Sequence, residues 1–213
     1  MDDNFAYFLK NFGPAFDRRE VPEASLNRYR DKLPEQMLAY WREHGWCGYA
    51  EGLFWTVNPE DYEALVDMLL EGTELADQDR FHVIAKSAFG ALYLWGEATA
   101  DSLIIDTYLL RYLFDPRENL QRDLNFDARL FFGTQKRDIN DVEGYFQPAL
   151  KKLGRLAHDE LYGFVPAYPL AGSLEFNNLQ RLKDVEHLMF LAQLDSLESY
   201  NFPPFPEAAD LIR

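Results

Sequence analysis

The sequence predicts an α+β fold in which N-terminal helices pack on an antiparallel sheet and a smaller, helix-rich region follows. Three observations predict it. Apolar side chains recur at helical spacing before residue 45, β-rich runs separated by glycine follow up to residue 110, and helical spacing returns after residue 141. With 213 residues, 47% of them hydrophobic, the chain is long enough to bury a large core.

Helical signals dominate the first 44 residues. Two N-terminal aspartates offer a cap for a first helix, which Gly13-Pro14 ends. A second helix is predicted over residues 22–33 and a third over 34–44, each opened by a proline. Gly45 is the natural C-cap of the third helix.

A β-rich stretch follows these helices. Glycines and aromatic side chains after residue 45 predict a turn into a short strand at 53–57. Asn58-Pro59 then opens a further helix, which is expected to reach residue 74. Three later runs, rich in β-branched and aromatic residues, predict an antiparallel meander. These runs are 81–86, 91–95 and 102–110.

The C-terminal part has weaker signals. The run at 128–133 is predicted as a strand, and 141–156 as a helix that an internal proline kinks or splits. An irregular or extended connector is expected at 161–176. The region 177–197 has the clearest helical spacing in the chain, whereas the proline-rich tail at 201–213 is expected to lie extended on the surface.

Asp115-Pro116 is the best candidate for a domain boundary, because the secondary-structure signals weaken after it. The chain is therefore predicted to consist of an N-terminal domain at 1–114 and a smaller C-terminal domain at 115–213. No internal repeat or low-complexity linker interrupts the sequence.

The formal net charge of −15 limits the classes of partner. Nucleic acid and anionic membrane surfaces would repel such a protein, whereas a basic protein is its natural electrostatic match. A single cysteine excludes an intramolecular disulfide, and the N-terminus lacks the pattern of a secretory signal. The expected location is therefore the cytoplasm.

Few residues offer catalytic chemistry. Cys47 lies three residues after His44, and such a pair could form an activated thiolate, although a small buried residue in an aromatic turn is the simpler interpretation. Asp101 and Asp106 could act as paired carboxylates, but an acidic chain contains such pairs by chance. The sequence therefore predicts no catalytic residue.

Metal and cofactor motifs are also weak. The chain has four histidines, and no two have the spacing of ligands on one helical face. His82 alternates with apolar neighbours and is expected to be packed or hydrogen-bonded, while Asp138, Asp141 and Glu143 indicate a solvated charged turn. The glycines of 88–97 lack the spacing of a phosphate-binding loop. We therefore expect no metal and no cofactor.

Acidic residues concentrate between residues 43 and 79, where no lysine or arginine occurs. On a helix, Glu60, Glu63, Asp67, Glu71 and Glu74 would form one continuous face, with an apolar face beside it, and Asp77 and Asp79 lie in the adjoining turn. One interpretation is a merely solvated face, and the other is a docking surface for a basic partner. The predicted contact residues, named here the acidic stripe, are Glu60, Glu63, Asp67, Glu71, Glu74, Asp77 and Asp79.

Two pairs of segments resemble known families. Residues 33–62, which include WREHGWCGYAEGLFWTVNP, together with 88–97, resemble the GAD-like domain of bacterial immunity proteins. Residues 161–173 and 178–194 are similar to the C-terminal domain of unknown function that commonly follows it. The resemblance implies a type VI secretion immunity protein that stays in the bacterial cytoplasm and neutralises a cognate effector toxin. Toxins paired with this architecture are often nucleases, so a DNase bound in a 1:1 complex is expected.

The resemblance supplies no catalytic residues. A small hydrolase, or a DNA-mimic adaptor that binds several basic proteins, is the alternative function. The matching aromatic and glycine positions are interpreted as scaffold, because large rings bury apolar area and glycines allow tight turns between them. These positions are Trp41, Gly45, Trp46, Gly48, Tyr49, Gly52, Phe54, Trp55, Asn58 and Pro59.

Overall fold

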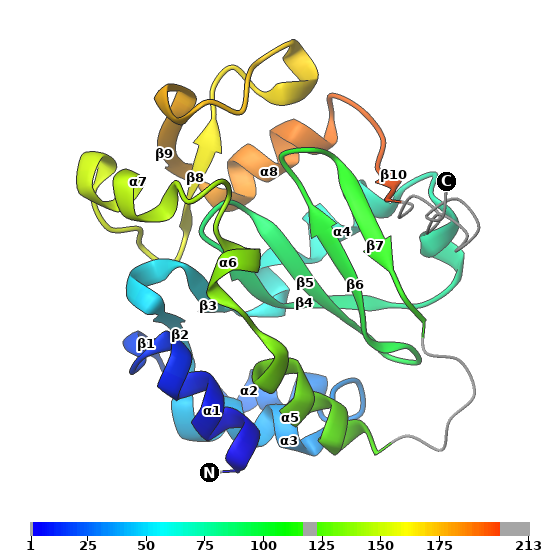
Figure 1. The fold of residues 1–213 in the computed structure, drawn as a ribbon. Helices are drawn as coiled ribbons and strands as arrows, with labels where there is room; N and C mark the ends of the chain where they lie inside the picture. The colour runs from blue at the N-terminus through cyan, green and yellow to red at the C-terminus, as the bar shows by residue number, and fades with distance from the viewer. Residues whose placement is uncertain (1, 117–122, 201–213) are drawn as a thin grey trace, which may run out of the picture.

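The computed structural model describes residues 2–116 and 123–200, and it has the predicted α+β fold (Figure 1). Its central feature is an eight-stranded sheet in the order β1-β2-β3-β4-β5-β6-β7-β10. Neighbours up to β7 are consecutive in the chain and antiparallel, and β10 then pairs with β7 in parallel. The strands are β1 Phe16–Arg19, β2 Trp46–Tyr49, β3 Phe54–Thr56, β4 Phe81–Ser87, β5 Ala91–Gly96, β6 Ala100–Asp106, β7 Arg111–Phe114 and β10 Glu198–Ser199.

Helices cover both faces of this sheet. Helices α5 and α6 lie in front of it in Figure 1, and α4 lies behind it. A separate two-stranded sheet pairs β8 Glu160–Phe164 with β9 Leu179–Lys183. The α-helices are α1 Asp3–Phe12, α2 Glu23–Tyr29, α3 Glu35–His44, α4 Glu63–Leu70, α5 Leu124–Thr134, α6 Arg137–Asn140, α7 Phe146–Leu153 and α8 Asp184–Ala192.

Side-chain alternation along β3 explains the layers. Successive strand residues point to opposite faces, so Phe54 and Trp55 enter different halves of the core. The ring of Phe54 lies 5.6 Å from that of Phe8 in α1, among the helices of the N-terminal half. Trp55 points to the opposite face of the sheet and pairs in register with Lys86. The ammonium group of Lys86 donates to the backbone oxygen of His158, in the C-terminal part of the chain. Every residue of β4 and β5 is buried, because both faces of these strands are covered.

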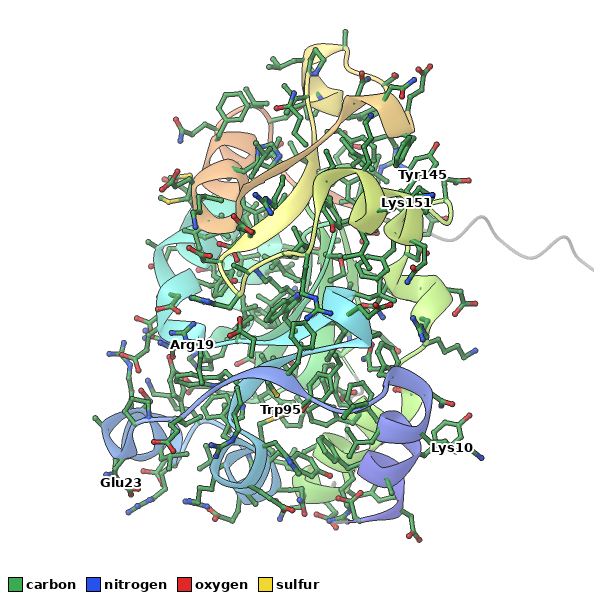
Figure 2. All side chains as sticks on the ribbon, turned by 90° about the vertical axis from the view of Figure 1, so that its left-hand side faces the viewer. Lys10, Arg19, Glu23, Trp95, Tyr145 and Lys151 are labelled. Carbon is green, nitrogen blue, oxygen red and sulfur yellow. The ribbon has the colours of Figure 1, made fainter. Side chains whose placement is uncertain are left out.

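Aromatic side chains fill the space between the layers. Trp41, Trp55 and Trp95 are each at most 1% exposed, and Figure 2 shows Trp95 in the interior while Lys10 projects outward. Rings pack edge to face at centroid distances near 5 Å, as between Phe16 and Trp55 at 5.1 Å. The concentration of tryptophan that the sequence shows between residues 41 and 55 therefore forms the centre of the core.

Several N-terminal predictions are confirmed. The carboxylate of Asp2 accepts hydrogen bonds from two backbone amides of α1, and Gly13 ends that helix. Helix α3 ends at Gly45, whose φ of 74° favours glycine. The second helix is shorter than predicted, because α2 already ends at Tyr29.

The predicted meander is confirmed, with one correction. The run at 102–110 is not one strand, because β6 ends at Asp106 and the chain turns before β7 begins at Arg111. Leu110 in this turn has a φ of 51°, which is incompatible with a continuing strand. Strands β1 and β2 were not predicted, since β1 consists mostly of charged residues and β2 contains Gly48.

Two C-terminal predictions are wrong. Residues 128–133 lie inside helix α5, where Asp123 caps the first turn and Phe131 and Phe132 are buried. The predicted helix at 177–197 is also divided, because its first part is strand β9 and only the part from Asp184 is helical. Pairing with β8, which is distant in the sequence, holds β9 extended.

The remaining C-terminal predictions are corrected in detail. Helix α7 begins only at Phe146, so Pro148 lies in its first turn and causes no kink. The predicted connector at 161–176 begins within strand β8. The tail at 201–213 is outside the described residues, and the division at Asp115-Pro116 stays a prediction. Within the described ranges, no helix is long and apolar enough to cross a membrane.

Candidate functional site

A groove of about 630 Å³ opens between α4 and the 3-10 helix η3, Glu74–Asp77. Apolar side chains such as Val66 and Phe81 form part of its wall, and Arg80 is its basic residue. Five of the seven acidic-stripe residues line it, so the tertiary structure gathers them around one concave surface. These five are Glu63, Asp67, Glu71, Asp77 and Asp79.

The acidic stripe is not the single helical face that its spacing predicts. Residues 59–62 form the 3-10 helix η2, and α4 runs only from Glu63 to Leu70. Gly72, with a φ of 76°, then turns the chain toward η3. After this turn, Asp77 lies in η3 and lines the groove together with residues of α4.

Two stripe residues form intramolecular ion pairs with Arg28 of α2. Arg28 binds both carboxylate oxygens of Glu63, at 2.6 and 2.7 Å, and one oxygen of Glu60 at 3.4 Å. Tyr29 donates a further hydrogen bond to Glu63, and Ser25 donates one to Glu60. Burial opposes the effect, but the Arg28 and Tyr29 hydrogen bonds lower the pKa of Glu63. These two acids therefore hold α2 against the start of α4.

Asp79 also has a structural role. Its carboxylate accepts hydrogen bonds from the backbone amides of Ala98 and Thr99 and from the Thr99 hydroxyl, at 2.6 to 3.1 Å. It therefore fixes the turn between β5 and β6. The other four stripe residues have exposed side chains that a partner could contact. They are Asp67, Glu71, Glu74 and Asp77.

The residues predicted as scaffold lie in the core or at its turns. Gly48 faces the rings of Phe16 and Trp55, and a Cβ added there would lie 2.6 Å from Phe16. The indole nitrogen of Trp55 donates to the carbonyl of Gly52 at 2.9 Å, which closes the turn between β2 and β3. Asn58 caps η2 through a hydrogen bond to the amide of Glu60. This packing positions α4, because η2 leads directly into it.

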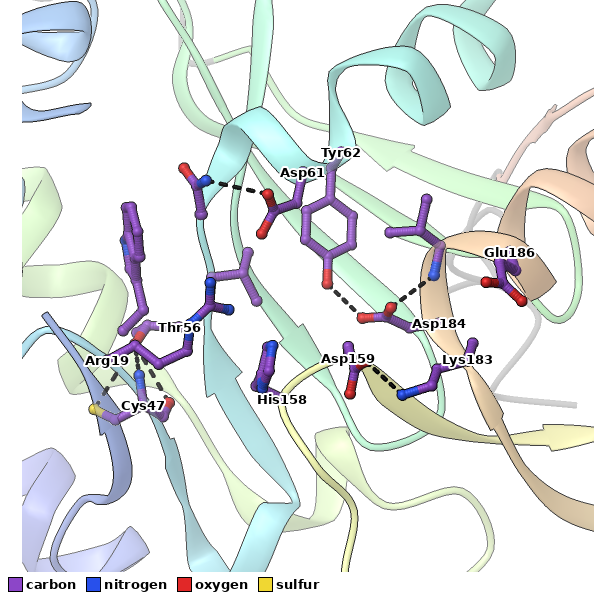
Figure 3. A pocket seen from close by; sticks show the side chains of 14 residues that line it. Arg19, Cys47, Thr56, Asp61, Tyr62, His158, Asp159, Lys183, Asp184 and Glu186 are labelled. Carbon is purple, nitrogen blue, oxygen red and sulfur yellow. Dashed lines mark hydrogen bonds and ion pairs between the residues drawn. The ribbon is translucent and has the colours of Figure 1, made fainter. Parts of the chain in front are cut away.

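A second, polar pocket of about 200 Å³ lies where the N-terminal and C-terminal halves meet. Figure 3 shows Arg19 of β1 and Tyr62 of η2 on one side of it, facing His158 and Asp184 of the C-terminal half. Sequence reasoning missed this pocket, since its residues come from four segments that are distant in the chain.

A buried ion pair joins the two halves at the base of this pocket. Lys86 of β4 is 0% exposed, and its ammonium group binds the Asp184 carboxylate and the backbone oxygen of His158. Tyr62 donates to the same carboxylate at 2.6 Å, and Asp184 also accepts from the amide of Val185. Burial lowers the pKa of Lys86, and Asp184 offsets part of that effect. Both charged groups therefore have further hydrogen-bond partners, which offset the cost of removing a charge pair from water.

The geometry at Cys47 is that of a buried structural thiol. The sulfur contacts the hydroxyl of Tyr49 at 3.1 Å, whereas His44 stacks on the ring of Phe5 at 4.4 Å. Burial raises the pKa of Cys47, which disfavours the reactive thiolate. Among the described residues, no group of three or more metal-ligating side chains is close enough to hold an ion.

Acidification from pH 7 to pH 5 is expected to reduce stability. Burial lowers the pKa values of His44, His82 and His187, so below about pH 6.5 these three histidines bind more protons in the unfolded chain than in the folded chain. The free energy of unfolding should therefore fall as the pH falls. Urea unfolding at pH 7 and pH 5 should show that the free energy of unfolding changes less with pH in His187→Leu than in the wild type. Identical pH dependence in the two proteins would contradict this expectation.

The acidic groove lies beside a core of buried aromatic side chains. The profile of the GAD-like domain matches residues 3–109, and that of the type VI secretion immunity protein Tdi1, C-terminal domain, matches residues 127–195. This chain belongs to the GAD-like domain family. The second match supports an immunity role.

A solved structure shares the fold. The crystal structure of Atu4351 from Agrobacterium tumefaciens superimposes with a TM-score of 0.83 at 24% sequence identity. The similarity covers 92% of this chain and 91% of that chain. No match was found among curated proteins.

Proposed function

We propose that this protein binds and neutralises a cognate type VI secretion effector, a DNase, as a 1:1 complex in the bacterial cytoplasm. The observation that carries the proposal is the groove between α4 and η3, in which five carboxylates surround one concave surface. The match to the C-terminal domain of Tdi1 supports the immunity role. Inhibition requires no bond to be made or broken, because occupying the effector surface is sufficient.

Electrostatics favour this partner. A nuclease presents a basic surface to the phosphates of DNA, and a protein with a net charge of −15 complements that surface. Complementary charge raises association rates by about 10- to 1000-fold. Close charge pairs across an interface couple by roughly 1.5–7 kcal/mol, compared with about 0–1 kcal/mol for exposed pairs. The exposed groove carboxylates therefore contribute most once a partner excludes water from them.

Charge reversal at Asp67, Glu71 and Asp77 should abolish protection. These three side chains are exposed, whereas Glu63 and Asp79 form intramolecular hydrogen bonds and stay unchanged. We expect the triple lysine variant to bind the effector at least about 100-fold more weakly, which is near 2.7 kcal/mol. Binding is measured by calorimetry with a catalytically inactive effector from the adjacent gene, and protection by growth on co-expression with the active one.

A matched control variant separates the effect of the groove carboxylates on binding from the effect of the net charge. Glu20, Asp31 and Glu175 are exposed acids outside the groove. Replacing all three by lysine changes the net charge from −15 to −9, by +6, as the groove variant does. This control should protect cells as the wild type does. Equal affinities of the two triple variants would reject the groove as the contact surface.

A further inference from the structure

A small pocket lined by tyrosines lies on the other face of the sheet. It encloses about 270 Å³, and its lining includes Tyr93, Ile104, Asp106 and Tyr108. The ring of Tyr93 contacts Phe131 of α5, so Tyr93 faces the α5 side, and it pairs in register with Ile104. Since strand side chains alternate, Asp106 lies on the same face as Ile104. Figure 1 shows α6 next to this part of β5 and β6, with no helix of the described chain in front of β7.

The carboxylate of Asp106 has no hydrogen bond or ion pair with any residue of 2–116 or 123–200. Its side chain is half-buried and lines the pocket. Burial raises the pKa of Asp106, and no compensating interaction opposes this. Arg111 lies opposite it in the β6–β7 register but stays exposed and forms no ion pair with it. A half-buried carboxylate without a partner among the described residues, lying beside aromatic rings, can pair with the positive charge of a ligand.

The tyrosines suit a cationic ligand. Aromatic ring faces attract ammonium and guanidinium groups, most strongly where water is excluded. Both rings are held before any ligand arrives. The hydroxyl of Tyr93 donates to Asn140 at 3.0 Å, and the ring of Tyr108 lies 6.0 Å from that of Phe164. The cavity is slightly smaller than those that hold drug-sized molecules, so its size fits a single cationic side chain.

We propose that this pocket binds one guanidinium or ammonium group, with Asp106 as the counter-charge and the rings of Tyr93 and Tyr108 as its walls. The source of the cation rests on the proposed function: it is an arginine or lysine side chain of the effector. The pocket would then be a second contact, separate from the acidic groove, that selects for a particular side chain.

Binding of a free cation tests the pocket without any effector. n-Butylguanidinium and n-butylammonium are titrated into the ¹⁵N-labelled full chain, with amide shifts followed by NMR. We expect saturable shifts at residues 91–93 and 104–113, and an affinity at least tenfold lower in Asp106→Asn. Asp31→Asn, the same change at an exposed acid, should bind as the wild type does. Equal affinities of Asp106→Asn and the wild type would overturn the proposal.

Three further measurements separate binding from a structural role. Tyr108→Phe should keep the affinity and Tyr108→Leu should lose it, because only the former keeps a ring. Asp106→Asn should melt at the same temperature as the wild type, since Asp106 forms no hydrogen bond or ion pair with the described residues. Arg111→Ala should bind the probes within twofold of the wild type. A tenfold gain on removing Arg111 would show that Arg111 itself occupies the pocket, which would overturn the proposal.

Binding measurements with the inactive effector test whether the cation is a side chain of the effector. Asp106→Asn should weaken binding of the inactive effector at least tenfold, compared with Asp31→Asn. If the probes bind the wild type but Asp106→Asn keeps full effector affinity, the assignment of the cation to the effector is overturned in favour of a free organic cation. If the wild-type chain fails to bind the effector, the proposed function fails, and the titration still decides whether the pocket binds cations.

Discussion

Lys86→Met is expected to lower the free energy of unfolding by about 3–5 kcal/mol, because it leaves the Asp184 carboxylate buried without its cation. Lys86 is fully buried and binds Asp184 together with the backbone oxygens of His158 and Glu160. These contacts join strand β4 to the C-terminal half, so the loss should also loosen that half. Urea unfolding followed by tryptophan fluorescence measures the change.

A neighbouring lysine provides the control. Lys183 forms an ion pair with Asp159 at the surface, where both side chains are about half exposed. Lys183→Met should therefore cost at most about 1 kcal/mol. Asp184→Asn added to Lys86→Met should recover part of the loss, since no unpaired charge remains and the amide oxygen can still accept from Tyr62. If the two single methionine variants unfold at the same urea concentration, the buried pair contributes little to stability.

Trp55→Ala is expected to cost about 3–5 kcal/mol, the range for removing a buried aromatic ring. Trp55 is 1% exposed and packs against Phe16 with the ring centroids 5.1 Å apart. Its loss also removes the hydrogen bond to the Gly52 carbonyl, which closes the β2–β3 turn. Chemical denaturation of the purified variant measures the cost, and a midpoint equal to that of the wild type would contradict the scaffold role.

Gly48→Ala tests the same packing from the opposite direction. A Cβ at position 48 would lie 2.6 Å from Phe16 and 2.9 Å from Trp55, so overpacking should cost about 1–3 kcal/mol. Gly48→Ala should lower the free energy of unfolding less in the Trp55→Ala background than in the wild type. The alanine at position 55 leaves room for the methyl group added at position 48. Strict additivity of the two changes would show that the two sites do not interact.

The N-terminal elements could be predicted because their signals are local. The cap at Asp2 and the stop at Gly13 lie within the helix they delimit, and Gly45 ends α3 in the same way. The glycine-separated runs of the meander are likewise adjacent in the chain, so hairpin pairing follows from the sequence order. Predictions failed where distant segments decided the conformation. Residues 179–183 have helical spacing but pair with β8, about 20 residues earlier.

The site shows the same division. The sequence by itself determined an acidic, aromatic-rich α+β protein, the concentration of carboxylates between residues 43 and 79, and the aromatic turn that forms the core. Only the tertiary structure decided which carboxylates are free: Arg28 binds Glu60 and Glu63, while Asp79 ties the β5–β6 turn. It also placed Asp106 among tyrosines and Lys86 against Asp184. The physical reason is that charge and helical or strand periodicity are local properties, whereas burial and pairing depend on segments that meet only after folding.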